Sequence, residues 1–226
     1  MTQNGQDHSG RKGDIKFYYD DANLALATRV VSKVAQALST TDYKDTVTII
    51  QVSNEPILWG SDYNYRLTRL QQYYNMAYKE VRKYTSSAYV AVHDAFIDPS
   101  NWYYLSNSSY SLVMLDTHYY QVFGDQYQNL TCDQQRDYPC NLKSILQTAN
   151  QKIKVVVGEW SLATPKICGN QSAFARNQIG VFENAGTGWF MWSFKNGQGW
   201  NEWDFLASNT RGWIPKLGSA KITATC

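Results

Sequence analysis

Apolar residues recur along the chain with two different periods, which predict alternating helices and strands. Val30, Val31 and Val34 belong to an apolar stripe with the three- and four-residue spacing of an amphipathic helix. Between such segments lie short, continuous apolar runs that are typical of buried strands. Helices are predicted over residues 22–38, 63–84, 142–149 and 173–184. Strands are predicted over residues 46–52, 89–92, 112–115, 153–157 and 188–194, with a weaker candidate over 15–18.

This alternation predicts an α/β fold in which helices cover both faces of a parallel sheet. Five strands are too few to close an eight-stranded barrel, which typically takes about 250 residues. The chain has 226 residues, and no internal repeat or low-complexity linker interrupts its pattern. We therefore expect a single domain over residues 1–226 that is incomplete at its N-terminus.

The composition argues against several functional classes. The net charge is +2 and charged residues make up 18% of the chain, so the electrostatic signature of a nucleic-acid-binding protein is missing. No apolar stretch reaches the roughly 18 residues of a membrane span, and the polar segment 1–14 lacks the apolar core of a signal peptide. Aromatic residues reach 15%, with 17 Tyr and 8 Trp. Such rings stack on sugars in binding clefts, although composition alone favours an ordinary Tyr-rich core and surface.

Glycosylation sequons and cysteines nevertheless indicate an exported protein. The Asn-x-Ser/Thr sequons begin at Asn107, Asn129 and Asn170. The four cysteines include no Cys-x2-Cys pair of the kind found in zinc sites, so disulfides are the better explanation, with three possible connectivities. We expect Cys132 to pair with Cys140 across a short loop. The other pair, Cys168 with Cys226, would attach the C-terminal tail to the fold.

Polar residues gather where the predicted strands end, and the C-terminal ends of parallel strands form the active-site face of barrel enzymes. The strand-end segments are Asn54-Glu55-Pro56, Asp116 through Tyr120, and Gly158-Glu159-Trp160. Taken singly, a strand-end glutamate is usually an ordinary loop carboxylate, His118 a structural histidine and Trp192 a core residue. The combination of Asn-Glu-Pro with Gly-Glu-Trp, three βα units later, favours an active site.

These segments belong to a longer series of motifs that extends over nearly the whole chain. The series comprises Gln3-Asn4-Gly5, Asp7, Ser9-Gly10, Asn54-Glu55-Pro56, His93-Asp94-Ala95-Phe96, Asp116 to Phe123, Gly158 to Ser161, Gly188 to Lys195 and Glu202 to Phe205. In type and order it resembles the fungal exo-β-1,3-glucanases of glycoside hydrolase family 5. The resemblance implies a (β/α)8 TIM-barrel fold, truncated here to its last five βα units. It also implies an enzyme, a retaining β-glycosidase that releases glucose from β-1,3-glucan.

The resemblance assigns a role to each matching residue. Glu159 corresponds to the nucleophile, and Glu55 to the acid/base that protonates the departing oxygen and later activates water. The implied substrate-binding residues are Asn54 at the 2-hydroxyl, His118 and Tyr120 beside the nucleophile and the −1 sugar, Trp192 under that sugar, Phe96 and Phe123 around the next glucose, and His8. The family requires no metal and no cofactor.

The chain also departs from the family. Its pattern begins inside the loop after the family's third strand, so an arginine and a histidine that support the nucleophile have no counterpart. Gln6 and His8 stand where the family has Phe and Asn, and Phe194 replaces its second Trp. An incomplete gene model, an inactive truncated paralogue and a chain completed by another subunit all fit this pattern. The isolated chain is expected to have little activity.

The implied partner is a β-glucan, with no nucleic-acid or membrane partner, and the full-length protein is expected to be a monomer. Its expected location is outside the cell or in the cell wall. Two alternatives remain open. A non-catalytic glucan-binding protein would use the aromatic residues alone, and an endo-β-1,4-glucanase of the same family would share both glutamates but give no reason for Phe96 and Phe123.

Overall fold

The computed structural model describes residues 15–226, which form two compact units. The first unit contains the described residues up to Asp98 together with Leu105–Met114. The second contains Pro99–Tyr104 together with Leu115–Cys226. That residues 1–226 make up a single catalytic domain stays a prediction.

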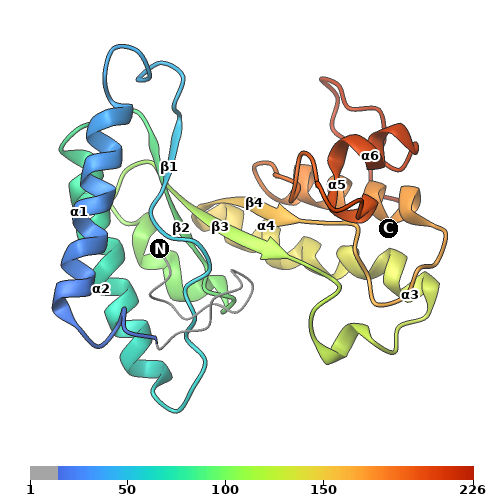
Figure 1. The fold of residues 1–226 in the computed structure, drawn as a ribbon, viewed down its shortest axis with the longest axis horizontal. Coiled ribbons are helices and arrows are strands. Elements are labelled where there is room, and N and C mark those ends of the chain that lie inside the picture. Colours follow the sequence, from blue (N-terminus) through green and yellow to red (C-terminus); the bar gives the residue numbers. More distant parts are fainter. Residues whose placement is uncertain (1–14) are drawn as a thin grey trace. The chain divides into compact units, whose positions relative to one another are not determined.

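Strands and helices alternate along the chain (Figure 1). The strands are β1 (Ile49–Gln51), β2 (Tyr89–His93), β3 (Val113–Tyr119) and β4 (Lys154–Trp160). The α-helices are α1 (Asp21–Leu38), α2 (Tyr63–Arg82), α3 (Cys132–Asp137), α4 (Lys143–Lys152), α5 (Gln171–Ala185) and α6 (Phe205–Thr210). Short 3-10 helices are η3 (Pro99–Ser106), η4 (Asp125–Tyr127), η5 (Tyr138–Leu142) and η6 (Asn201–Trp203). The strands are hydrogen-bonded in the order β1-β2-β3-β4, with β1 and β2 parallel.

Four predicted strands are confirmed with shifted ends, but the fifth, over residues 188–194, is wrong. That segment forms only an isolated parallel bridge between Val157 and Trp189. Further along, the N–H of Ser193 donates to the carbonyl of Trp203, and the carbonyl of Ser193 accepts the N–H of Phe205. The segment is also bonded to β4, where the N–H of Phe190 donates to the carbonyl of Val157 and the N–H of Trp192 donates to the carbonyl of Trp160, both at 2.9 Å, but it does not form a regular strand. The weaker candidate strand, residues 15–18, runs into a turn.

In the first unit, α1 packs against α2 (Figure 1). The buried face of α1 includes Ala27 and Val31, and the N-terminus of the helix is capped by the Asp20 side chain, which accepts the N–H of Ala22. Val30 and Val34, which the sequence pattern placed in the same apolar stripe, are exposed. The stripe is therefore narrower than the pattern predicts.

In the second unit, α5 packs against α3, α4 and η5. Its buried side chains include Phe174, Ile179 and Phe182. Trp160, at the end of β4, packs edge-on against Phe182 and Trp189. This cluster anchors the end of β4, where Glu159 lies. Among residues 15–226, no helix is both long and apolar enough to cross a membrane.

The predicted disulfide connectivity is wrong: Cys132 pairs with Cys168, and Cys140 pairs with Cys226. Cys132 begins α3, and Cys140 lies in η5, which follows α3 directly. Eight helical residues advance the chain by roughly 12 Å, beyond the roughly 7 Å that a disulfide spans between Cα atoms. The Cα–Cα distances of the observed pairs are 5.4 and 6.0 Å.

The C-terminal tail lies along α5. A disulfide of Cys226 attaches it to the fold, but the partner is Cys140 and not the predicted Cys168. The buried Asn177 side chain accepts both the N–H and the hydroxyl of Thr225, at 2.8 and 2.7 Å. The Glu183 carboxylate accepts the N–H of Ile222 at 2.6 Å. Gly180 permits this approach, because a Cβ there would overlap the backbone of Ala224.

Candidate functional site

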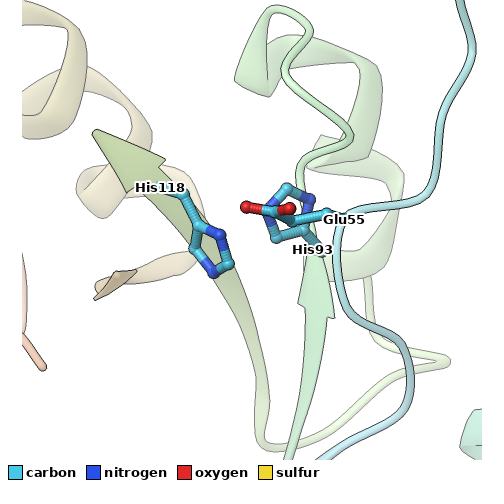
Figure 2. Close-up of side chains that lie close together, drawn as sticks. All are labelled: Glu55, His93 and His118. Carbon is cyan, nitrogen blue, oxygen red and sulfur yellow. The ribbon is translucent and has the colours of Figure 1, made fainter. Parts of the chain in front are cut away.

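Glu55 lies on the segment that follows β1 in the first unit, and its side chain is shown in Figure 2. It is only 5% exposed, and its backbone has a φ of 41°. A left-handed conformation costs a residue with a side chain about 1–2 kcal/mol. Such conformations persist where the surroundings impose them, and they cluster at functional sites. Asn54, immediately before it, is exposed.

Two tyrosines of α2 hold the strand ends beside Glu55. The Tyr73 hydroxyl donates to the carbonyl of Val52 at 2.6 Å, and the Tyr74 hydroxyl donates to the carbonyl of His93 at 2.7 Å. Burial raises the pKa of both hydroxyls, so both remain protonated donors at ordinary pH. The ends of β1 and β2 are therefore fixed from the same helix.

The turn after β2 presents Phe96. The N–H of Ala95 donates to Nδ1 of His93 at 2.9 Å, and the N–H of Phe96 donates to Oδ1 of Asp94 at 2.8 Å. Ala95 and Phe96 both have positive φ angles, 56° and 58°. The Phe96 ring lies edge-on to His93, with centroids 5.0 Å apart. Local side-chain bonds thus hold a strained turn that keeps the Phe96 ring partly exposed.

His93 is fully buried, and its hydrogen bond fixes its protonation state. Because Nδ1 accepts a backbone N–H, the imidazole is the neutral tautomer with its proton on Nε2. One Glu55 carboxylate oxygen and one His93 ring nitrogen lie within 4.8 Å of each other (Figure 2).

In the second unit, Glu159 near the end of β4 is held by residues of β3 and the segment after it. The Tyr120 hydroxyl donates to Oε2 of Glu159 at 2.5 Å. Nδ1 of His118 lies 3.6 Å from the same oxygen. Nε2 of His118 lies 3.2 Å from Oδ2 of the buried Asp116. Asp116, His118 and Glu159 therefore form a carboxylate–imidazole–carboxylate series, and Tyr120 adds a short, charge-assisted bond.

Gly158 makes room for this series. A Cβ at Gly158 would overlap the carboxylate of Asp116. The glycine is thus required by the close approach of Asp116 to β4, directly beside Glu159. Asp116 orients His118 in the way that carboxylates commonly orient functional histidines.

Aromatic rings extend outward from Tyr120 in the second unit. Trp203 lies 5.3 Å from the Tyr120 ring and 6.1 Å from the Phe123 ring, between centroids. Phe123 is 58% exposed and Trp192 is 55% exposed. Phe123, Tyr120 and Trp203 thus form a contiguous aromatic group beside Glu159.

The predicted site residues are divided between the two units. The first unit holds Asn54, Glu55 and Phe96, and the second holds His118, Tyr120, Phe123, Glu159 and Trp192. His8, the remaining predicted site residue, lies outside the described residues. So do Gln6 and the motif around it.

Two aromatic residues were missed by the sequence analysis as site components. Trp59 is exposed in the segment that follows Glu55, and its ring centroid lies 6.1 Å from that of Phe96. Trp203 contacts Tyr120 and Phe123. Trp59 belongs to none of the recognised motifs, and Trp203 lies in a motif to which no role was attached. The high tryptophan content was the one feature of the sequence that could have pointed to further aromatic site residues.

Comparisons with known proteins identify the family of the chain. Residues 8–198 match the family model described as Cellulase (glycosyl hydrolase family 5). The chain is 29% identical over 276 residues to a glucan 1,3-beta-glucosidase of Blumeria graminis, covering 100% of this chain and 61% of that protein. It is 30% identical over 232 residues to glucan 1,3-beta-glucosidase 1 of Schizosaccharomyces pombe, covering 90% and 55%. The chain therefore spans less than two thirds of the length of these relatives.

Solved structures show the same fold. The crystal structure of a rutinosidase from Aspergillus niger superposes with a TM-score of 0.78 at 16% sequence identity. The match covers 94% of this chain and 63% of that one. The expected fold, a partial (β/α) TIM barrel, is confirmed.

Proposed function

Because the chain belongs to glycosyl hydrolase family 5, we propose that it carries the two catalytic carboxylates of a retaining β-glycosidase. Glu159 is the nucleophile and Glu55 is the acid/base. In the first step, a Glu159 carboxylate oxygen attacks the anomeric carbon while Glu55 gives its proton to the departing glycosidic oxygen. In the second step, Glu55 takes a proton from water, which attacks the glycosyl ester and restores both carboxyl groups.

The contacts of Glu159 carry the nucleophile assignment. A nucleophilic carboxylate must be held so that one oxygen points at the anomeric carbon. The Tyr120 hydroxyl donates to Oε2 of Glu159, and the His118 ring lies beside the same oxygen, so both residues orient the carboxylate. Asp116 and Gly158 support this arrangement from behind. A protein that only binds glucan needs exposed rings but has no use for such a network, which favours an enzyme.

The surroundings of Glu55 support its role as acid/base. Its side chain is buried and therefore shielded from bulk water. Its backbone is held in a left-handed conformation next to the exposed Asn54, which we assign to the sugar 2-hydroxyl. The acid therefore has a fixed position and a neighbour able to orient the substrate.

We propose a β-1,3-linked glucan as the substrate, with release of glucose from chain ends. The two glucosidase relatives support this choice. The partly exposed Phe96 and the exposed Phe123 supply rings for the glucose on the leaving-group side, and Trp192 supplies a ring for the sugar next to Glu159. An endo-β-1,4-glucanase remains the alternative within the family. Two disulfides and three sequons support a protein that acts outside the cell or in its wall.

The test, made in a context with a complete barrel, compares Glu159→Gln and Glu55→Gln on two substrates, with Asp42→Asn, an exposed carboxylate between α1 and β1, as the control. Glu159→Gln should abolish hydrolysis of both an aryl β-glucoside and β-1,3-gluco-oligosaccharides. Glu55→Gln should lose far more activity on the oligosaccharides, because a good aryl leaving group departs without protonation. NMR of the first product should show the β-anomer. Equal losses on both substrates for Glu55→Gln, or an α-anomeric product, would refute the assignment.

A further inference from the structure

A cavity of about 220 Å³ lies in the second unit, beyond the residues to which a role has been given. Its lining includes Thr164, Ile167, Gln171, Trp200, Glu202 and Trp203. Ile167 is 77% exposed and Trp200 is 57% exposed. A protein surface does not ordinarily leave an indole and a branched aliphatic side chain open to water around a hollow. The rim is therefore suited to a ligand with an apolar face.

The cavity lies next to the candidate catalytic residues of the second unit, with Trp203 between them. This indole lines the cavity and also packs against the Tyr120 ring, 5.3 Å away between centroids. The hydroxyl of the same Tyr120 donates to Glu159. One aromatic side chain thus separates the hollow from the residue that contacts the proposed nucleophile.

The wall formed by η6 is fixed by backbone hydrogen bonds. The carbonyl of Glu202 accepts the N–H of Leu162, and the carbonyl of Trp203 accepts the N–H of Ser193, both at 2.9 Å. The carbonyl of Trp200 accepts the N–H of Trp203 at 3.1 Å. The side chains that line this wall therefore stand on a backbone tied to the segments after β4 and around Ser193.

The opposite rim is fixed by side chains and a disulfide. The carbonyl of Lys166 accepts bonds from the Gln135 amide and the Thr164 hydroxyl, both at 3.0 Å. The next residue but one, Cys168, is bonded to Cys132 of α3. Ile167 lies between these two anchors. The cavity is pre-formed, as small-molecule sites generally are.

The lining groups match a pyranose. Indole and aliphatic surfaces pack against its C–H faces, while a carboxylate, an amide and a hydroxyl bond its hydroxyl groups. We propose that this cavity is an additional sugar-binding subsite, which holds one further glucose ring of the glucan. Trp200 stacks on that ring and Glu202 accepts from its hydroxyl groups. The proposal rests on the proposed function for the identity of the sugar and adds a subsite to it.

The test is the dependence of binding on oligosaccharide length. Isothermal titration of the Glu159→Gln protein with β-1,3-linked gluco-oligosaccharides of increasing length measures binding without turnover. Affinity should rise when the oligosaccharide becomes long enough to fill the cavity. Trp200→Ala should weaken binding of the long oligosaccharides about tenfold and leave the shortest one unchanged. Trp200→Phe should restore part of the loss, because a smaller ring still stacks.

Paired variants distinguish loss of the subsite from a general loss of protein stability. Ile167→Ala should reduce binding of the long oligosaccharides, whereas Ile145→Ala, an exposed isoleucine on α4, should not. The subsite is refuted if Trp200→Ala weakens short and long ligands equally, or neither. Hydrolysis of the aryl β-glucoside by the protein with Glu159 intact tests the proposed function separately. Loss of hydrolysis with the length dependence intact would contradict the proposed function but not the subsite. Hydrolysis without any length dependence would contradict the subsite but not the proposed function.

Discussion

Gly158 links the backbone of β4 to the chemistry proposed for Glu159. A methyl group at this position would overlap the Asp116 carboxylate, which is buried against β4 and bonds His118. Asp116 would have to move, and His118 would lose its orientation toward Glu159. Overpacking of this kind costs about 1–3 kcal/mol of stability. Displacement of a supporting group by about 1 Å can lower a rate about 100-fold.

We therefore predict that Gly158→Ala lowers kcat by about 100-fold and lowers the Tm by several degrees. The control is Gly188→Ala, in the same unit, where an added Cβ meets nothing within 4 Å. Kinetics on an aryl β-glucoside and a thermal melt provide the two measurements. A Gly158→Ala enzyme with normal kcat would show that Asp116 has no influence on the nucleophile.

The three sequons differ in accessibility. Asn107 and Asn129 are exposed. Asn170 is half-buried, and its side-chain nitrogen donates to the carbonyl of Cys132 at 3.2 Å. Because a glycan would be attached through this same nitrogen, we predict occupancy at Asn107 and Asn129 but little at Asn170. Peptide mapping after enzymatic deglycosylation of protein from a secreting host measures all three, and full occupancy at Asn170 would contradict the prediction.

At the scale of elements, α2 acts as a support for the strand ends of the first unit. Its Tyr73 and Tyr74 hydroxyls bond the carbonyls of Val52 and His93, close to Glu55 and to the turn that carries Phe96. Removing such a buried donor costs about 1–3 kcal/mol. We predict that Tyr73→Phe and Tyr74→Phe each lose stability in this range. Urea unfolding measures the loss.

Tyr63→Phe, in the first turn of α2, is the matched control for these variants. It should change stability little, because Tyr63 is only half-buried and lies ten residues before Tyr73 along the helix. Activity gives a second readout. Tyr73→Phe should lose more activity on oligosaccharides than on an aryl β-glucoside, since it shifts the segment of the acid/base. A uniform loss on both substrates would argue for a purely structural role.

The sequence predicted most elements but failed over residues 188–194 for a physical reason. Phe190, Trp192 and Phe194 give this segment the apolar character of a buried strand, yet all three are exposed. Exposed aromatic rings have the same sequence pattern as rings in a core, so the pattern cannot distinguish the two. The candidate glutamates, in contrast, lie at strands that the pattern located: Glu55 follows β1, and Glu159 lies near the end of β4. The sequence did not predict Trp59 and Trp203 as site residues, because their contacts with Phe96 and Tyr120 form only in the folded protein.

At the scale of the whole molecule, covalent cross-linking is confined to one of the two units. All four cysteines lie after residue 115, so both disulfides belong to the second unit. The first unit is held by non-covalent contacts such as its α1–α2 packing and its strand pairing. Spacing could not reveal the connectivity, because it depends on how α5 packs against α3 and η5. Reduction should therefore affect the two units unequally.

We predict that replacing Cys140 and Cys226 by serine destabilises the second unit by about 2–4 kcal/mol. The Cys140–Cys226 pair spans 86 residues and the Cys132–Cys168 pair spans 36. The longer loop should contribute more stability, by roughly 0.8 kcal/mol from loop-closure entropy. Hydrogen exchange measured by mass spectrometry should quicken in α5 and the C-terminal tail. Exchange in α2 and β2 should stay as in the unaltered protein, and equal acceleration there would show that the disulfides stabilise both units together.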